Sequence, residues 1–408
     1  MAAIKAGRDI HALGSESVGR LLIRFSIPAM IAMLVGMVYN VTDRFFISRW
    51  VGMEGVAAVS ITAPMFITII AFELMTSVGG NALFAIRLGQ GKNKEAARVL
   101  ANTFMLQLIL GLGFAAAALL NFEGLLRFLG TSDAVIPHAR DYMLPITAFS
   151  VLQIAGMGMN PFIRTCGHPR RVMVNSVVGA LLNVLLDYVF MAKLGMGITG
   201  AALGTVISQA TVFAMVHSFF LDPSNPMRHR REAMRPDART MWQIFRYGMS
   251  PFLLQLAFVV NAYITNIMLM KYRGDAAVSA YGIVNSIIMF VILPAFGITQ
   301  AMQSIAGYNF GAKNWARLKQ TLGYTLAGVN VWMFILSISL WAFKAPIIGM
   351  FDGGSNGADM IGLASEIAGV LVVSLPLLGV VFVAGTYLLA TGRYMQSLAF
   401  NMVRQFAF

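Results

Sequence analysis

The chain has 408 residues, of which 58% are hydrophobic and 12% charged, and its mean hydropathy is +0.73. An average soluble domain carries roughly a quarter charged residues, so this composition excludes an ordinary soluble fold. The formal net charge is +13, and the single cysteine, Cys166, excludes an internal disulfide and a multi-cysteine metal cluster.

Apolar runs of about 20 residues recur along the whole chain, and each is long enough to cross a bilayer as a helix. They predict an all-α polytopic membrane protein with about 11 helices. The first run follows a polar stretch with Lys5 and Arg8 and has no small-residue cleavage site, so we expect no removed signal peptide. The predicted helices lie at roughly 21–44, 55–78, 98–120, 135–160, 171–192, 199–220, 243–270, 277–301, 321–342, 362–389 and from about 395 onward.

Several segments recur about 222 residues apart. The sequence around Gly89 is echoed around Gly311, and Thr165-Cys166-Gly167 is echoed by Ala390-Thr391-Gly392. Duplicated sets of membrane-length helices are typical of transporters, and repeats in the same orientation are related by an axis along the membrane normal. We therefore predict two parallel-repeat lobes of six helices, with the substrate path in a cleft between them.

The longest polar stretch lies in the middle of the chain and reads as a linker. It divides the chain into an N-terminal lobe at 1–221 (helices 1–6), a linker at 222–242 and a C-terminal lobe at 243–408 (helices 7–11). Because the repeat calls for a sixth helix in the second lobe, we expect either a truncated product or an incomplete second lobe.

Basic residues gather on one side of the predicted helices. The linker alone carries Arg228, Arg230, Arg231, Arg235 and Arg239. Such a bias places the amino terminus and the linker in the cytoplasm. We expect a multi-pass protein of a bacterial or archaeal cytoplasmic membrane. The positive charge is thus explained by topology, and no nucleic-acid partner is expected.

Asp43 lies late in the first predicted helix, where a charged group in hydrocarbon is costly and is usually kept for function. Tyr39 and Asn40 lie four and three residues before it, so the three side chains share one helix face, and Asn40 is a candidate for the cavity. The alternative is that Asp43 is solvated at the outer interface.

Asn183 and Asp187 lie midway along the fifth helix, and their spacing of four places them one above the other. Amide and carboxylate oxygens are ligands that a hard cation such as sodium prefers. The same pair could also hold a proton, or could join helices by a structural hydrogen bond.

Glu73, in the second helix, is either a cavity residue or half of a structural ion pair. Helices seven to nine carry no acid in their interiors, so coupling chemistry is expected in the first lobe. The second lobe offers neutral groups that could orient a substrate or merely pack between helices. The candidates are Gln255, Asn261, Asn285 and Gln303.

One nucleotide-like motif is weak. Gly195–Gly200 matches GxGxxG but connects two membrane helices and follows no strand, so we expect no dinucleotide cofactor. Gly200 and Gly204 more simply allow the sixth helix to approach a neighbour closely.

Taken together, these residues resemble the multidrug and toxic compound extrusion (MATE) family, in the branch without acidic residues in the second lobe. The resemblance covers nearly the whole chain. It rests on Pro28, Tyr39–Asp43, Ala57–Val59, Gly89, Asn183, Asp187 and Gly200–Gln209. Arg44 departs from the small polar residue that the family commonly has there.

The resemblance implies a cation-coupled antiporter, not an enzyme, that exports amphipathic and often cationic compounds by alternating access. In similar proteins the coupling site uses the residues matching Asp43, Asn183, Asp187 and Thr205, with Tyr39 nearby, and the ion is Na⁺ or H⁺. The same four residues would be the ligands of a sodium ion. No other cofactor is implied, and we expect a monomer. The alternative is a lipid-linked oligosaccharide flippase of the same superfamily, which would need a more cationic cavity.

Overall fold

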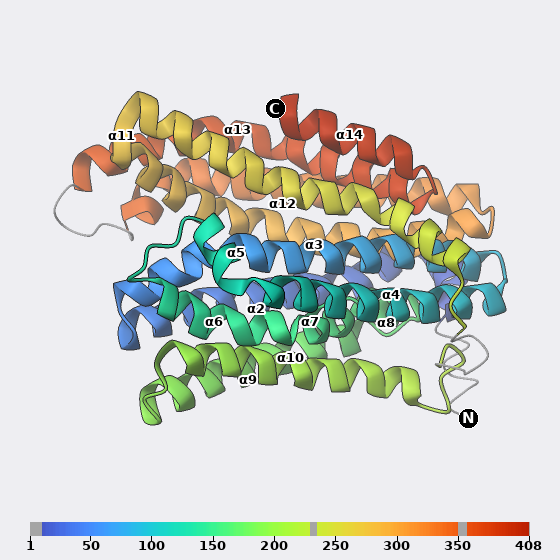
Figure 1. Cartoon of the computed structure of the whole chain (residues 1–408). Coiled ribbons are helices and arrows are strands. Elements are labelled where there is room, and N and C mark those ends of the chain that lie inside the picture. The colour runs from blue at the N-terminus through green and yellow to red at the C-terminus, as the bar shows by residue number, and fades with distance from the viewer. Residues whose placement is uncertain (1–9, 229–234, 350–356, 408) are drawn as a thin grey trace.

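The structure is a computed structural model that describes residues 10–228, 235–349 and 357–407 (Figure 1). Within these ranges every regular element is helical. Lys5 and Arg8, and the linker residues Arg230 and Arg231, lie outside the described residues.

The helices follow the predicted order along the chain, with residues 10–15 forming a short helix before them. In the first half they are α2 (Val18–Trp50), α3 (Met53–Gly89), α4 (Asn93–Leu120), α5 (Phe122–Phe128), α6 (Ile136–Ala148), α7 (Ser150–Met157), α8 (Asn160–Thr165), α9 (Pro169–Asp187), the π-helix η1 (Tyr188–Lys193) and α10 (Gly197–Leu221). In the second half they are α11 (Ala238–Gly311), α12 (Trp315–Gly349), α13 (Gly357–Ala390) and α14 (Tyr394–Ala407).

Nine helices in the described part of the chain are long and apolar enough to cross a membrane, and a bent pair brings the number to as many as ten. The bent pair is Ile136–Ala148 with Ser150–Thr165, which meet at 49° where a single helix was predicted at 135–160. Helix α11 comprises two of the predicted helices, which meet at Gly274. The φ of Gly274 is 72°, outside the helical range, and the chain turns back there (Figure 1). The prediction of an all-α polytopic membrane protein is confirmed.

The start of α11 is fixed by local hydrogen bonds at the end of the linker. Asp237 caps the helix by accepting from the Arg239 amide at 3.1 Å and from the Thr240 hydroxyl at 2.6 Å. The bond from Thr240 holds the pKa of the Asp237 carboxyl below its ordinary value. The Asp237 amide in turn donates to Asn102 Oδ1 on α4 at 2.8 Å, so the linker end is anchored to the first half of the chain.

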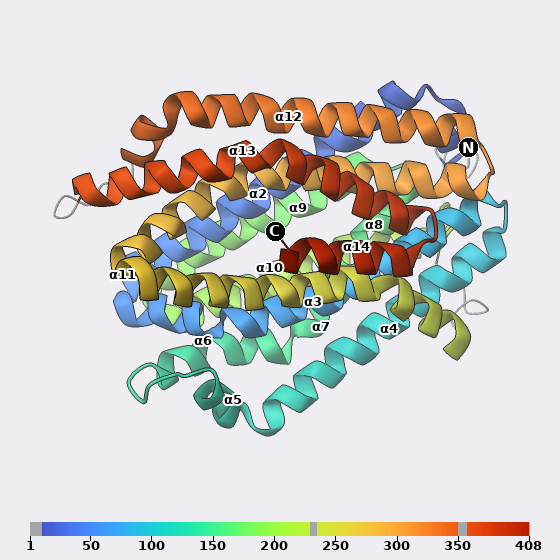
Figure 2. The same ribbon diagram turned by 90° about the horizontal axis from the view of Figure 1, so that it is seen from above.

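Viewed from above, α12 and α13 lie along one edge of the bundle, α4 and α5 along the opposite edge, and α3 and α11 between them (Figure 2). The contact between α3 and α11 is close because it uses glycine. A Cβ at Gly248 would overlap the backbone carbonyl of Met75, and one at Gly79 would lie 2.6 Å from the carbonyl oxygen of Ile244.

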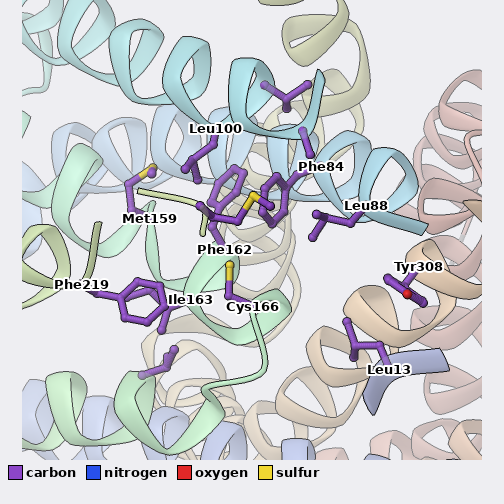
Figure 3. Close-up of a cluster of buried hydrophobic side chains, with 14 of the residues drawn as sticks. Leu13, Phe84, Leu88, Leu100, Met159, Phe162, Ile163, Cys166, Phe219 and Tyr308 are labelled. Carbon is purple, nitrogen blue, oxygen red and sulfur yellow. The ribbon is translucent and has the colours of Figure 1, made fainter. Parts of the chain in front are cut away.

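The buried apolar side chains form three clusters. One lies within α2–α10 and another, apart from the half-buried Met30 of α2, within α11–α14. The third combines both halves: Phe84 of α3 and Phe162 of α8 pack edge to face with ring centroids 5.2 Å apart, in the same cluster as Leu13 and Tyr308 of α11 (Figure 3). This cluster joins the amino-terminal segment to both halves of the chain.

Candidate functional site

Asp43 and Asp187 are brought together by the packing of α2 against α9. Asp43 is 5% exposed and Asp187 is 0% exposed, and their carboxyl groups lie within hydrogen-bonding reach of each other. The alternative that Asp43 is solvated at the interface is therefore excluded. Two carboxylates in contact away from water repel each other strongly, so either a proton neutralises one of them or a cation lies with the pair.

Asn183 and Thr205 complete the polar group around Asp187, and both are buried. The amide of Asn183 can be turned end for end, and the surrounding hydrogen bonds decide its orientation. In the orientation that satisfies both ends, Nδ2 donates to Asp187 Oδ2 at 3.0 Å and Oδ1 accepts from the Thr205 amide at 3.2 Å. In the other orientation Nδ2 donates to Thr205 Oγ1 at 3.3 Å and the amide oxygen faces Asp187.

Two tyrosines border the pair of carboxylates. The hydroxyl of Tyr39, on α2, lies within hydrogen-bonding reach of Thr205. The hydroxyl of Tyr142, on α6, reaches Asp43 in the same way, and its side chain is buried. Sequence reasoning missed Tyr142, because nothing in its local sequence indicates that α6 meets the end of α2.

The chemistry of this site suits an exchangeable small cation. Asp43 Oδ1 and Asp187 Oδ1 are buried oxygens without a hydrogen-bond partner among the described residues. Buried acceptors are nearly always satisfied, and a proton or a hard cation that prefers oxygen ligands could satisfy these two. Two carboxylates, an amide and a hydroxyl fit sodium. No group of three or more His, Cys, Asp or Glu that could hold a metal ion occurs among the described residues.

Asn40 does not join this site. Its side chain is exposed and donates to the Gly36 carbonyl of its own helix at 2.8 Å. Tyr39 and Asn40 diverge because successive residues on a helix point about 100° apart. Arg44 is also exposed, although its charge acts on Asp43.

Glu73 lies on α3 and is paired with a neutral partner, because Gln153 Nε2 of α7 donates to its Oε2 at 2.7 Å. The preceding residue, Phe72, packs against Phe114 and against Phe252 of α11, with centroid distances of 6.1 and 5.5 Å. Glu73 therefore lies close to the contact between the two halves of the chain.

The candidates of the second half occupy different surroundings. Gln303 is buried and donates to the Val78 carbonyl of α3 at 3.1 Å, across the two halves. Asn261 donates to the Gln405 carbonyl of α14 at 3.4 Å, within the second half. Gln255 and Asn285 are half-buried. The structure does not gather these four side chains into one group.

The fold and the buried carboxylates thus define a polytopic helical membrane protein with a pair of acidic side chains in its interior. The sequence model of the MatE family matches residues 28–189 and again residues 251–407. The chain belongs to the MatE family.

Curated relatives carry a common description. The chain is 25% identical over 385 residues to a "Multidrug export protein MepA" of Staphylococcus saprophyticus, covering 94% of this chain and 84% of that protein. It is 26% identical over 378 residues to the protein of the same description from Staphylococcus haemolyticus, covering 93% and 82%.

Solved structures share the fold. One, described as the "outward-facing conformation of a multidrug resistance MATE family transporter", superposes with a TM-score of 0.91 at 24% identity, over 97% of this chain and 87% of that one. Another, described as a "MOP superfamily transporter from Pyrococcus furiosus", gives the same TM-score, identity and coverage.

Proposed function

We propose that this chain is a cation-coupled antiporter that exports small amphipathic, often cationic organic compounds across the cytoplasmic membrane. The observation that carries the proposal is the contact between the Asp43 and Asp187 carboxyl groups, buried between α2 and α9. The description of the staphylococcal relatives as multidrug export proteins supports the class of substrate. The activity is transport, in which the compound leaves chemically unchanged.

The exchange would use the buried pair as the resting place of a sodium ion or a proton moving inward. A cation bound there neutralises the mutual repulsion of Asp43 and Asp187 and favours close packing of α2 against α9. Its departure restores the repulsion and loosens that contact. Coupling requires that the cation and the exported compound prefer different conformations, since a ligand shifts an equilibrium only by its differential affinity.

Two lobes, 1–221 and 243–408, would move against each other about the linker 222–242, with the amino terminus in the cytoplasm. The two matches to the same family model support this division, because they begin at Pro28 and Pro251, at corresponding places in the repeat. The exporter would act as a monomer and need no cofactor other than the coupling ion.

A lipid-linked oligosaccharide flippase is the other candidate. Its diphosphate substrate calls for several buried cations. Arg164 is one buried cation of the described residues, whereas the charged groups of the site described here are carboxylates. Electrostatics therefore favours a cationic compound.

The test is dye efflux from cells that express Asp43→Asn or Asp187→Asn. Each substitution keeps the size of the side chain and removes the charge that holds a cation, so efflux should fall to the level of cells without the transporter. Glu123→Gln is the control, since Glu123 is exposed on α5 and its carboxylate pairs with Arg140 at 3.0 Å. Efflux close to wild type in both Asp variants would overturn the proposal.

The coupling ion is identified with purified protein in vesicles. Sodium and proton gradients are imposed separately, and dye movement is followed in each case. Transport driven by neither gradient would remove the coupling from the proposal.

A further inference from the structure

Gly204 lies on α10 directly beside the Asp187 carboxyl group. A Cβ at this position would lie 2.5 Å from Asp187 Oδ1, 3.4 Å from the Cβ of Leu186 and 3.5 Å from the Asp187 amide nitrogen. Non-bonded carbon and oxygen atoms do not approach to 2.5 Å. Any residue other than glycine would therefore displace this carboxylate oxygen.

The displaced atom, Asp187 Oδ1, would be a ligand of the proposed ion. Asp187 Oδ1 and Asp43 Oδ1 are both buried, and neither has a hydrogen-bond partner among the described residues. The other oxygen, Oδ2, is within 3.0 Å of the Asn183 amide group. The free oxygen of Asp187 is thus the one that faces Gly204, and the absence of a side chain there sets its position.

We propose that Gly204 is a positioning residue that holds the Asp187 carboxylate where it and Asp43 can share a sodium ion. This inference rests on the cation site proposed above and adds a residue that makes no contact with the ion itself. Ligands of a functional site must be held within about 0.5 Å of their productive positions. A methyl group at Gly204 moves Oδ1 by a comparable amount.

Gly204→Ala should affect the Asp187 carboxylate without disturbing helix packing, because the methyl group meets only the end of that side chain at close range. The close atom is the end of a side chain, which can turn away without moving either helix. Gly200, one turn earlier on α10, offers the contrast: a Cβ there would lie 2.9 Å from the Cβ of Phe190, an atom fixed to the backbone. Gly200→Ala therefore disturbs the packing of α10 against η1 without touching a carboxylate.

The experiment measures sodium binding by thermal unfolding of the purified full chain, since a ligand that binds the folded state raises the melting temperature. Sodium chloride is titrated against choline chloride at constant ionic strength. We expect a sodium-dependent rise for the wild type and at least a tenfold higher sodium midpoint for Gly204→Ala. Gly200→Ala should lower the melting temperature without sodium and keep the wild-type midpoint. Gly204→Ser is the second variant if the alanine protein is not obtained folded.

A double variant assigns the effect to Asp187. In an Asp187→Asn background, Gly204→Ala should leave the sodium response unchanged, because the carboxylate that it displaces has already been replaced by a neutral amide. An unchanged sodium midpoint in Gly204→Ala would overturn the role of Gly204, as would a wild type that sodium does not stabilise. If Asp43→Asn and Asp187→Asn both keep the full sodium response, the cation site itself fails, which is a distinguishable result.

Discussion

Gly89 and Gly311 lie 222 residues apart in two segments of similar sequence, and each packs against the backbone just before the other. A Cβ at Gly89 would overlap the carbonyl of Tyr308, and a Cβ at Gly311 would overlap the carbonyl of Ile86. Tyr308 and Ile86 each lie three residues before the glycine of their own copy. The contact between the ends of α3 and α11 is therefore reciprocal, and it depends on glycine at both positions.

This reciprocal contact predicts a stability effect. Gly89→Ala and Gly311→Ala should each destabilise the described arrangement by about 1–3 kcal/mol, because the added methyl meets backbone that cannot turn away. Thermal unfolding of the purified protein measures the loss. Gly323→Ala, on α12, is the control: nothing lies within 4 Å of its Cβ position, so it should be neutral or slightly stabilising. Equal melting temperatures for all three variants would contradict the contact.

Tyr142→Phe is expected to weaken cation binding. The hydroxyl of Tyr142 reaches Asp43, and a hydrogen bond to a charged group is worth about 1.5–3 kcal/mol. We expect the concentration of the coupling ion needed for half-maximal dye efflux to rise about tenfold, which corresponds to roughly 1.4 kcal/mol. Tyr188→Phe is the control, because Tyr188 is exposed. Unchanged ion dependence in Tyr142→Phe would mean that this hydroxyl contributes only to packing.

Glu73→Gln tests whether the negative charge of Glu73 attracts a cationic exported compound or whether the side chain only stabilises the fold. The amide keeps the size of the side chain and can still bond to Gln153, while the negative charge is lost. Efflux of cationic dyes should fall several-fold, and efflux of a neutral dye should stay near wild type. The two dyes are compared in the same cells. An equal fall for both would indicate that Glu73 acts through the fold.

Arg164 and Gln300 form a buried bond between the two halves of the chain. Arg164 is 4% exposed, and its Nη2 donates to Gln300 Oε1 at 2.8 Å. Gln300→Met removes that acceptor from a buried cation and should cost about 1–3 kcal/mol. Adding Arg164→Met should recover part of the loss, and a double-mutant cycle on melting temperature measures the coupling. Strict additivity of the two substitutions would contradict a direct interaction.

Sequence patterns were sufficient to predict the helices and the interactions within a single helix. Hydropathy and length predicted the membrane-length segments, because each must bury its backbone polar groups by itself in a bilayer. The spacing of Asn183 and Asp187 predicted that their side chains are adjacent, since a separation of four residues places two side chains on one helix face. Spacing within one helix did not indicate the surroundings of Asn40, because its exposure depends on which side of α2 is covered by other helices.

The contacts between helices were decided by tertiary structure alone. The resemblance to a known family, and no local pattern, grouped Asp43 with Asp187, and nothing in the sequence indicated that Tyr142 reaches this pair or that Gly204 leaves room beside it. The sequence by itself determined a helical membrane protein with costly carboxylates in its interior, because apolar length and buried charge are properties of single segments. Packing determined which of those groups form a site, because the pairing of α2, α6, α9 and α10 depends on surfaces that only the folded chain brings together.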